Sequence, residues 1–260
     1  MKILVCTKRV PDLETIPTPE IPPKSPADIF RDGLAWRMNR YDEYAVEAAL
    51  QLRETTGASR IDALTVGEED AEEVLRRAMG MGADHGVHIL QTNDRLTSPF
   101  TIAGLMAAYA RERAYDLILC GTMSEDLMQG LVGPIMAGML GWPCLTSVHA
   151  FAQSERSQAL VCEREIEGGC QEALEIDLPA LLTIQSGSCQ PRYPALSKLL
   201  RANTYPLEVF SEETLAPADA RQRVVTVRPP EQRREGVRIE GSSESKAHQL
   251  AAMLRSKGLC

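Results

Sequence analysis

Residues Gly121 to Pro143 read GTMSEDLMQGLVGPIMAGMLGWP, and this stretch decides the fold because a buried strand ends there in a small-residue loop that leads into a helix. The apolar run Asp116 to Cys120 predicts the strand. Helical spacing then joins Val132, Ile135, Met136, Met139 and Leu140. Such a junction points unpaired backbone N–H groups into the crevice beyond the carboxyl ends of a parallel sheet. We therefore expect a nucleotide or another phosphate-bearing ligand there.

The composition is that of an ordinary globular protein. A chain of 260 residues, 44% of them hydrophobic, can form one large domain or one domain with a substantial tail. A net charge of -8 disfavours nucleic acid and anionic lipid, which carry the same sign. No stretch approaches the roughly 20 apolar residues that span a bilayer, and the opening MKILVCTKRV is too quickly charged for a secretory signal. We expect a cytoplasmic protein with no membrane insertion and no nucleic-acid partner.

The seven cysteines and four histidines show no spacing typical of disulfides, metal ligands or a catalytic pair. Several cysteines fall in apolar runs, where a reduced thiol behaves as a small hydrophobe. The sequence also lacks a G-x-G-x-x-G fingerprint, a P-loop and a Ser/His/Asp grouping. We expect no metal site and no catalytic side chain.

Apolar runs alternate with helical patterns over the first half of the chain. The strand-like runs are Lys2–Thr7, Arg60–Val66, Gly86–Leu90 and Asp116–Cys120. The helical patterns between them are Asp42–Glu54, Glu69–Met81 and Ser98–Ala114. This alternation predicts an α/β fold with a doubly wound, mostly parallel, Rossmann-like sheet.

The pattern changes after Pro143. Further strand-like runs are Ala159–Glu165, Gln171–Ile176 and Leu181–Ile184, of which the first two predict a hairpin through Glu167-Gly168-Gly169. From Ser186 onward Gly, Pro and charged residues dominate until a last helix near Ser243–Lys257, and so little periodicity rarely makes a core. We expect a nucleotide-binding domain at residues 1–190 and, at residues 191–260, an extended arm and helix that pack on a partner subunit.

Candidate ligand contacts gather where predicted strands end or helices begin. Lys8 and Arg9 follow the first strand, where a solvated charged loop is the alternative reading. Asn39 can cap a helix with Asp42 three residues on, and capping alone would explain both. Val66 lies where exposed backbone can bond an adenine edge, although a plain strand-to-turn transition fits equally well. Because these positions meet the loop quoted above at one edge of the sheet, the sequence favours a nucleotide pocket.

Eight blocks in fixed order along nearly the whole chain carry a family resemblance. They are KILVCTKRVPD (Lys2–Asp12), MNRYDEYAVEAAL (Met38–Leu50), LRRAMGMGADHGVHIL (Leu75–Leu90), DLILCGTMSED (Asp116–Asp126), MAGMLGWP (Met136–Pro143), EREIEGG (Glu163–Gly169), LPALLTIQSGSCQPRYPAL (Leu178–Leu196) and PPEQRREGVRIE (Pro229–Glu240). With these blocks the chain resembles the beta subunit of electron transfer flavoproteins. The series is far more specific than any single block.

The resemblance implies an electron-carrier subunit rather than an enzyme. It implies a heterodimer with an alpha subunit that accepts electrons from flavoprotein dehydrogenases and passes them to a quinone oxidoreductase or another acceptor. In that family the redox FAD is held mainly by the alpha subunit, and the beta crevice holds AMP or, in electron-bifurcating members, a second FAD.

The resemblance also implies roles for particular residues. By position, the cofactor-binding residues are Cys6, Asn39, Arg40, Tyr41, Asp42, Val66, Ser124, Asp126, Gly130, Leu131, Val132 and Gly133. Leu196 matches a leucine that family members present to their dehydrogenase partners, as an apolar anchor within a polar surround. Ordinary packing is the alternative for Leu196.

The chain departs from the family pattern around the same crevice. Leu131-Val132-Gly133 stands where members commonly have Gln-Thr-Gly, whereas Val132-Gly133-Pro134 repeats the Val-Gly-Pro of bifurcating members. Arg40 replaces the usual proline, and Leu13 stands where many members have a tyrosine near the flavin ring. Backbone N–H groups survive these changes, so we still expect AMP or the AMP half of FAD.

Two other functions remain open from the sequence. A stand-alone adenine-nucleotide-binding regulatory module fits the altered loop at Leu127 to Val132, but such a module does not need the long tail from Pro191. An enzyme acting on adenylated substrates through Lys8, Arg9 and Arg40 lacks a phosphate-cradling motif.

Overall fold

The fold is built on one twisted sheet, seen in a computed structural model that describes residues 1–12, 14–15, 34–57, 60–91, 97–156, 158–215, 220–222, 224–226 and 236–259. The chain divides into two compact units, Met1–Val227 and Arg228–Cys260. Leu13 and the first part of the PPEQRREGVRIE block lie outside the described residues.

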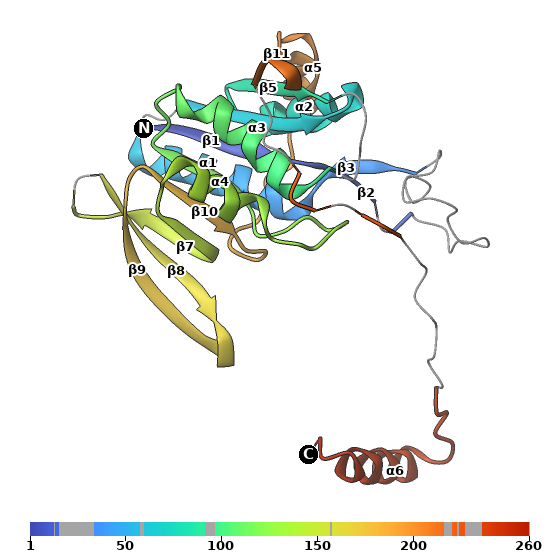
Figure 1. The fold of residues 1–260 in the computed structure, drawn as a ribbon. Coiled ribbons are helices and arrows are strands. Elements are labelled where there is room, and N and C mark those ends of the chain that lie inside the picture. Colours follow the sequence, from blue (N-terminus) through green and yellow to red (C-terminus); the bar gives the residue numbers. More distant parts are fainter. Residues whose placement is uncertain are drawn as a thin grey trace. The chain divides into compact units, whose positions relative to one another are not determined.

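Among the described residues, nine strands form the main sheet in the order β11-β5-β4-β1-β6-β10-β7-β8-β9 (Figure 1). Their bounds are β1 Lys2–Thr7, β4 Arg60–Gly67, β5 His85–Leu90, β6 Leu117–Gly121, β7 Cys144–Gln153, β8 Ala159–Ile166, β9 Cys170–Asp177, β10 Ala180–Ile184 and β11 Glu208–Ser211. Neighbours from β11 to β7 pair in parallel, while β7–β8 and β8–β9 are antiparallel. This confirms the predicted doubly wound sheet with an added hairpin.

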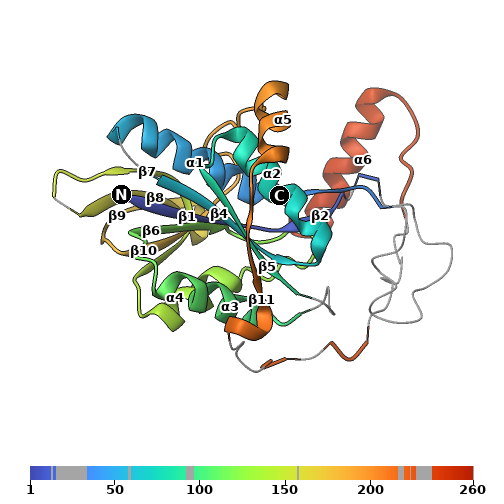
Figure 2. The same cartoon turned by 90° about the horizontal axis from the view of Figure 1, so that it is seen from above.

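Helices cover both faces of the parallel strands. They are α1 Arg40–Thr56 and α2 Glu72–Met81 on one face, and α3 Pro99–Arg111 and α4 Val132–Leu140 on the other (Figure 2). Along β1, Ile3 and Val5 pack in the core under α1 and α2, while Leu4 packs in the core under α3 and α4. Side chains alternate across a strand, so burial on both faces explains why β1 is a continuous apolar run.

The strand order reverses beside β1. From β1 the chain builds β4 and then β5 on one side, and it returns through α3 to place β6 on the other side of β1. A crevice therefore opens at the carboxyl ends of β1, β4 and β6, which is the topological switch point where ligands bind in such sheets.

Several elements were not predicted. Strand β7 was not predicted because bulges near Val148 interrupt the alternation of its side chains between the two faces, and Ser147 has a positive φ of 58°. A small antiparallel pair joins β2 (Arg9–Pro11) to β3 (Trp36–Met38). A short turn of 3-10 helix, η2 (Glu69–Ala71), precedes α2, and two more are η3 (Glu167–Gly169) and η4 (Glu212–Leu215).

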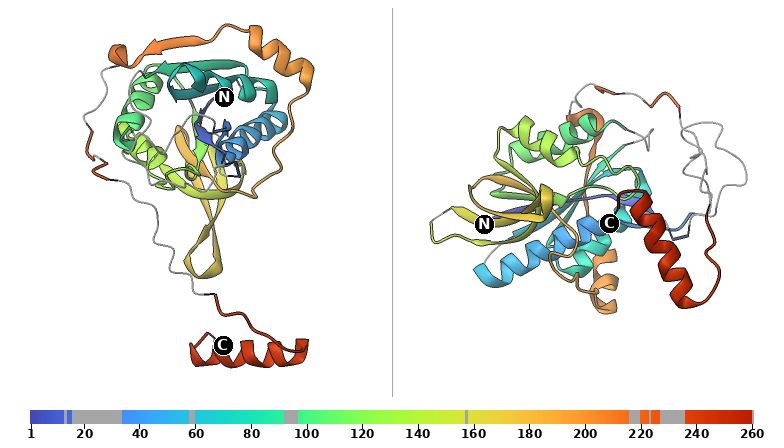
Figure 3. Two further views of the ribbon diagram at one scale, coloured as in Figure 1. Left: turned by 90° about the vertical axis from the view of Figure 1, so that its right-hand side faces the viewer. Right: turned by 90° about the horizontal axis from the view of Figure 1, so that it is seen from below.

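The stretch expected to belong to the arm contains two regular elements that are part of the first unit. Helix α5 (Leu196–Thr204) packs on α2, and β11 pairs with β5 (Figure 3). In the second unit, α6 (Ser243–Ser256) matches the predicted last helix, and the Ser242 side chain caps it by accepting from the N–H of Ser245. No helix among the described residues is long and apolar enough to cross a membrane.

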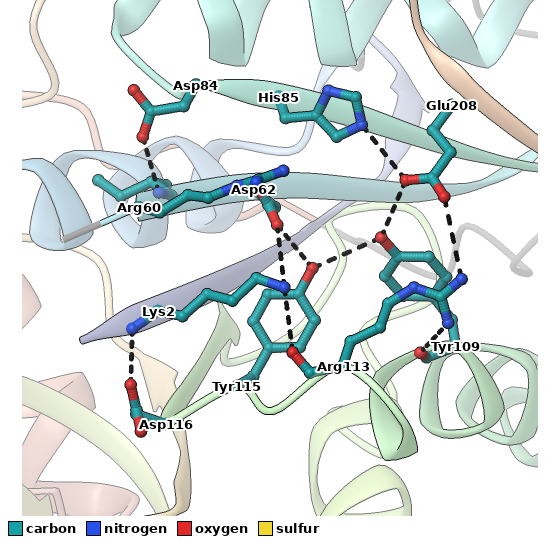
Figure 4. A network of polar contacts seen from close by, with 11 residues as sticks. Lys2, Arg60, Asp62, Asp84, His85, Tyr109, Arg113, Tyr115, Asp116 and Glu208 are labelled. Atoms are coloured by element: carbon teal, nitrogen blue, oxygen red, sulfur yellow. Dashed lines mark hydrogen bonds and ion pairs between the residues drawn. The ribbon is translucent and has the colours of Figure 1, made fainter.

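A network of side chains ties the amino end of the sheet to β11 (Figure 4). The Tyr115 hydroxyl donates to the buried Asp62 carboxylate at 2.8 Å, and Arg60 Nε donates to the same carboxylate at 2.8 Å. The Tyr109 hydroxyl lies 3.5 Å from that of Tyr115 and donates to Glu208 of β11 at 3.4 Å. Burial raises the pKa of the Tyr115 hydroxyl, which therefore stays protonated and donating at neutral pH.

Candidate functional site

The crevice at the switch point is a real cavity. Its volume is about 180 Å³, roughly ten times the cavity volume that one water molecule needs. Ten of the twelve predicted cofactor-binding residues line it: Cys6, Asn39, Asp42, Val66, Ser124, Asp126, Gly130, Leu131, Val132 and Gly133. Arg40 and Tyr41 are not among the lining residues. The structure thus brings most of the predicted set to one place.

Asp42, in the first turn of α1, joins the ends of two strands. Its carboxylate accepts the backbone N–H of Lys8, just past β1, at 2.8 Å and that of Gly121, at the end of β6, at 3.0 Å. Burial raises the pKa of this carboxyl to about 7, although Asn39, Gly121 and Lys8 favour the charged form. Asp42 therefore holds the floor of the crevice together at the point where the sheet opens.

Asn39 lies at the N-cap position of α1, but the expected side-chain cap is wrong. Its side chain makes no capping hydrogen bond. Instead Asn39 Nδ2 donates to the carbonyl of Met123 at 2.9 Å, and Asn39 Oδ1 accepts the N–H of Glu125 at 3.1 Å. The amide thus fixes the loop after β6, because that loop offers a matched donor and acceptor that outcompete the helix end.

The start of α4 presents open backbone donors to the cavity. Within the described part of the chain, no acceptor bonds the backbone N–H groups of Gly130, Leu131, Val132 and Gly133. Leu131 at the N-cap offers no capping side chain, and Pro134 has no N–H to satisfy. These donors lie at the positive end of the helix dipole, so the position favours an anion.

Two glycines let backbone approach backbone around this cavity. A Cβ on Gly133 would lie 2.7 Å from Cys120 Sγ and 2.9 Å from Thr183 Cγ2. A Cβ on Gly121 would lie 2.5 Å from the Cβ of Tyr41 and 2.6 Å from Asp42 Oδ1. Neither position has room for a side chain, so both glycines are needed to bring α4 and α1 against the strand ends. Tyr41 contributes here through packing.

The deepest part of the lining is apolar. Cys6 at the end of β1 and Cys120 in β6 are both buried, free thiols. Burial raises the pKa of each thiol, with the Asp42 carboxylate adding to the effect, so both stay uncharged at neutral pH. They act as small hydrophobes rather than as nucleophiles.

The cations singled out in the sequence are engaged by carboxylates. Lys8 Nζ lies 2.6 Å from Asp126 and also donates to Ser124 at 3.4 Å. Arg9, the second residue after β1, pairs with Asp70 at 2.6 Å while its guanidinium lies over the Trp36 ring.

Arg40 lies at the edge of the same loop. Its guanidinium is 2.6 Å from Glu14 and 3.8 Å from Glu125, and the side chain is 49% exposed. Each of the three cations is thus paired with at least one carboxylate.

Sequence reasoning missed the wall supplied by β5 and α3. Gln91 follows β5, and Ile102 and Met106 lie on α3, so this wall combines one amide with two apolar side chains. The Gln91 N–H donates to the carbonyl of Gly67 at 2.9 Å, which engages the strand end beside Val66. The rule that all parallel strands end at the same edge would have found these residues, since β5 was predicted.

No cluster of His, Cys, Asp and Glu able to hold a metal ion occurs among the residues that the structure describes. The fold and the crevice together define the class: a Rossmann-like α/β protein with its candidate site at the topological switch point. Comparison with known proteins narrows this class to a family.

The family model described as "Electron transfer flavoprotein domain" matches residues 28–215. The chain is 35% identical to electron transfer flavoprotein subunit beta of Bacillus subtilis (strain 168), over 87% of this chain and 88% of that protein. It is 33% identical to the mitochondrial subunit beta of Oryza sativa subsp. japonica over 94% and 95%, and 31% identical to subunit beta of Homo sapiens over 99% and 98% of the two chains. The chain belongs to the electron transfer flavoprotein beta subunit family. Its role is in electron transfer, as the sequence blocks indicated.

Proposed function

We propose that this chain forms a heterodimer with an electron transfer flavoprotein alpha subunit that holds most of the redox FAD. The pair accepts electrons from flavoprotein dehydrogenases and passes them to a quinone oxidoreductase or another acceptor. The near full-length similarity to subunits beta of bacteria, plants and mammals supports this assignment. The flavin supplies the redox chemistry when bound, and this chain contributes binding and orientation.

The crevice is proposed to hold an adenine nucleotide, either AMP or the AMP half of a second FAD. One observation carries this proposal: the residues from Gly130 to Gly133, whose N–H groups have no acceptor in the described chain, line a cavity at the switch point. A phosphate accepts from several such donors at once and gains from the helix dipole. Leu131 and Val132 contribute through their backbone, so the loss of amide and hydroxyl side chains there does not remove the site.

The cavity walls match the remaining parts of such a ligand. The side chains of Val66, Ile102 and Met106 offer an apolar surface for a flat base. Asn39, Asp42 and Asp126 organise the loop and the strand ends, and Ser124 and Lys8 lie beside them. Gly133 also fits, because it lets the start of α4 lie directly against Cys120, where a Cβ would clash.

Leu196 is proposed to dock the dehydrogenase. It is the first residue of α5, its side chain is 72% exposed, and Tyr193 and Leu200 nearby are also exposed. Apolar side chains presented on an ordered helix are suited to a small, transient interface. The second unit with α6 is proposed to be the arm that packs on the alpha subunit, and the pair is proposed to act in the cytoplasm.

Stable flavin binding is expected to require both subunits. We would purify the chain alone and after co-expression with an alpha subunit, and then scan the flavin absorbance bands. The pair should carry FAD and the isolated chain little. A full complement of tightly held FAD on the isolated chain would overturn the heterodimer proposal. A chain that keeps an adenine nucleotide but neither binds an alpha subunit nor gains flavin would instead be a regulatory module.

A further inference from the structure

Arg192 fastens the segment before α5 to α1. Its Nε and Nη2 atoms donate to the two carboxylate oxygens of Glu47 at 2.8 and 2.9 Å, and its backbone N–H donates to Glu47 Oε2 at 3.1 Å. The third guanidinium nitrogen, Nη1, donates at 2.8 Å to Glu54, two turns further along α1. A planar guanidinium makes such a two-pronged contact, and an ammonium does not.

This contact is buried on the side of Glu47, which is 3% exposed. Burial alone would raise the pKa of Glu47, but the hydrogen bonds from Arg192 and Gln51 outweigh it and hold the pKa below its usual range. At neutral pH the Glu47 carboxylate is thus charged and hydrogen-bonded to Arg192. A buried, two-pronged ion pair fixes geometry more firmly than the exposed pairs elsewhere on the chain.

The rest of α5 is fixed on the same side. Arg76 of α2 donates to the carbonyl of Ala202 at 2.7 Å and to that of Tyr205, closing the carboxyl end of the helix. Leu199 packs so closely on α2 that a Cβ at Gly80 would lie 2.5 Å from its Cδ2 atom. With both ends and the inner face held, Leu196 is left facing outward.

We propose that Arg192, acting through Glu47, is a positioning residue that presets α5 for the dehydrogenase before the two proteins meet. The inference rests on the proposed docking role of Leu196. A helix already held in its bound position loses less conformational freedom on binding. Releasing Arg192 therefore weakens docking without touching the crevice, because its partners Glu47 and Glu54 lie in the middle and the last turn of α1, while Asn39 and Asp42 lie at its start.

The test uses the full heterodimer with a flavoprotein dehydrogenase as electron donor and varied concentrations of the pair. Arg192→Met and Glu47→Gln should each raise the KM for the pair about tenfold and leave kcat within twofold. Because both act through one contact, the double variant should be no worse than the more damaging single variant. Arg192→Lys keeps the charge without the fork and should fall between wild type and Arg192→Met.

Two further measurements separate positioning from general damage. Flavin content and the rate of chemical reduction by dithionite should stay at wild-type values in all variants. Arg60→Met is the matched control, since Arg60 Nε also donates to a buried carboxylate at 2.8 Å but at the amino end of β4. Its KM should not change. Loss of flavin in both Arg192→Met and Arg192→Lys would overturn the proposal.

The variant Leu196→Ala distinguishes a failure of the docking role of Leu196 from a failure of the positioning role of Arg192. If it raises KM while Arg192→Met and Glu47→Gln leave KM within twofold, the positioning role is wrong and the docking role stands. If Leu196→Ala leaves KM unchanged, the docking role itself is wrong, and the positioning role is lost with it.

Discussion

The two ends of the sheet use polar groups in opposite ways. At the amino end, side chains hydrogen-bond to one another: Tyr115 donates to the buried Asp62, and Tyr109 donates to Glu208 (Figure 4). At the carboxyl end, the backbone N–H groups from Gly130 to Gly133 find no acceptor in the described chain. Saturated polar groups stabilise a fold, whereas the first N–H groups of a helix stay available to water or to an anion. We infer that the amino end contributes mainly to stability, and we propose that the carboxyl end binds the ligand.

The largest change in AMP affinity should come from a substitution that displaces the start of α4 at the carboxyl end of the sheet. Gly133→Ala places a methyl group 2.7 Å from Cys120 Sγ, so the start of α4 must shift away from β6 and β10. Overpacking of this kind costs about 1–3 kcal/mol of folding stability. We expect the displaced helix start to lose binding free energy of the same order, which lowers the affinity for AMP roughly 10- to 100-fold by calorimetry.

Gly138 of the same helix provides the control, because a Cβ there meets nothing within 4 Å. Gly138→Ala should leave affinity unchanged and add up to about 1 kcal/mol of stability. Equal effects of the two alanines on affinity would contradict the role given to the α4 start.

The second prediction concerns the pH dependence that Asp42 imposes. Burial raises its pKa from 3.8 to about 7, so the folded chain holds this proton more tightly than the unfolded chain does. The resulting stability is complete below about pH 4 and is lost as the pH rises through 7. Between pH 5.5 and 7 this amounts to roughly 2 kcal/mol.

Urea unfolding of wild type and Asp42→Asn over pH 5.5 to 8 measures this directly. Wild type should lose stability relative to Asp42→Asn up to about pH 7, and the difference should then level off. A difference independent of pH would show that Asp42 stays ionised in the crevice.

A smaller effect is expected at the amino end. Tyr115→Phe removes the hydroxyl that donates to Asp62, and hydrogen bonds to charged groups contribute about 1.5–3 kcal/mol. Arg60 still contacts Asp62, so we expect the lower limit, about 1.5 kcal/mol by urea unfolding. AMP affinity should not change. Tyr205→Phe, at a half-exposed ring, is the control, and a loss of AMP binding in Tyr115→Phe would break the division between the two ends.

The smallest effect is expected at Arg40, which was predicted to bind the cofactor. Its guanidinium is half exposed and lies against Glu14 and Glu125, and exposed pairs contribute about 0.2–1 kcal/mol. Arg40→Gln should therefore change AMP affinity less than threefold in the same calorimetric titration. A tenfold loss would place this guanidinium on the phosphate.

The sequence predicted most of the fold because its signals are local. A continuous apolar run such as Lys2–Thr7 reflects a strand buried on two faces. The helical spacing of apolar residues in Val132–Leu140 reflects a helix buried on one face. β7 was missed because bulges disrupt its alternation, and β11 was missed because it has only four residues and its two apolar residues are adjacent. The helix α5 was missed because it is short and follows a stretch rich in Gly and Pro, although Leu196, Leu199 and Leu200 recur in it at helical spacing.

The residues that line the cavity were predicted to a similar degree, while their role in binding a cofactor stays a prediction. The backbone elements of the site follow from the rule of strand ends, and the loop residues follow from family position. The partner of each polar side chain could not be predicted, because it depends on contacts distant in sequence. Asn39 bonding the loop at Met123, and Glu47 bonding Arg192, are examples.

Mass spectrometry of the small molecules released from the purified alpha–beta pair tests the central claim most directly. We predict one adenine nucleotide for each copy of this chain, either AMP or a second FAD, in addition to the FAD of the alpha subunit. A single FAD per pair, with no further adenine nucleotide, would contradict the account.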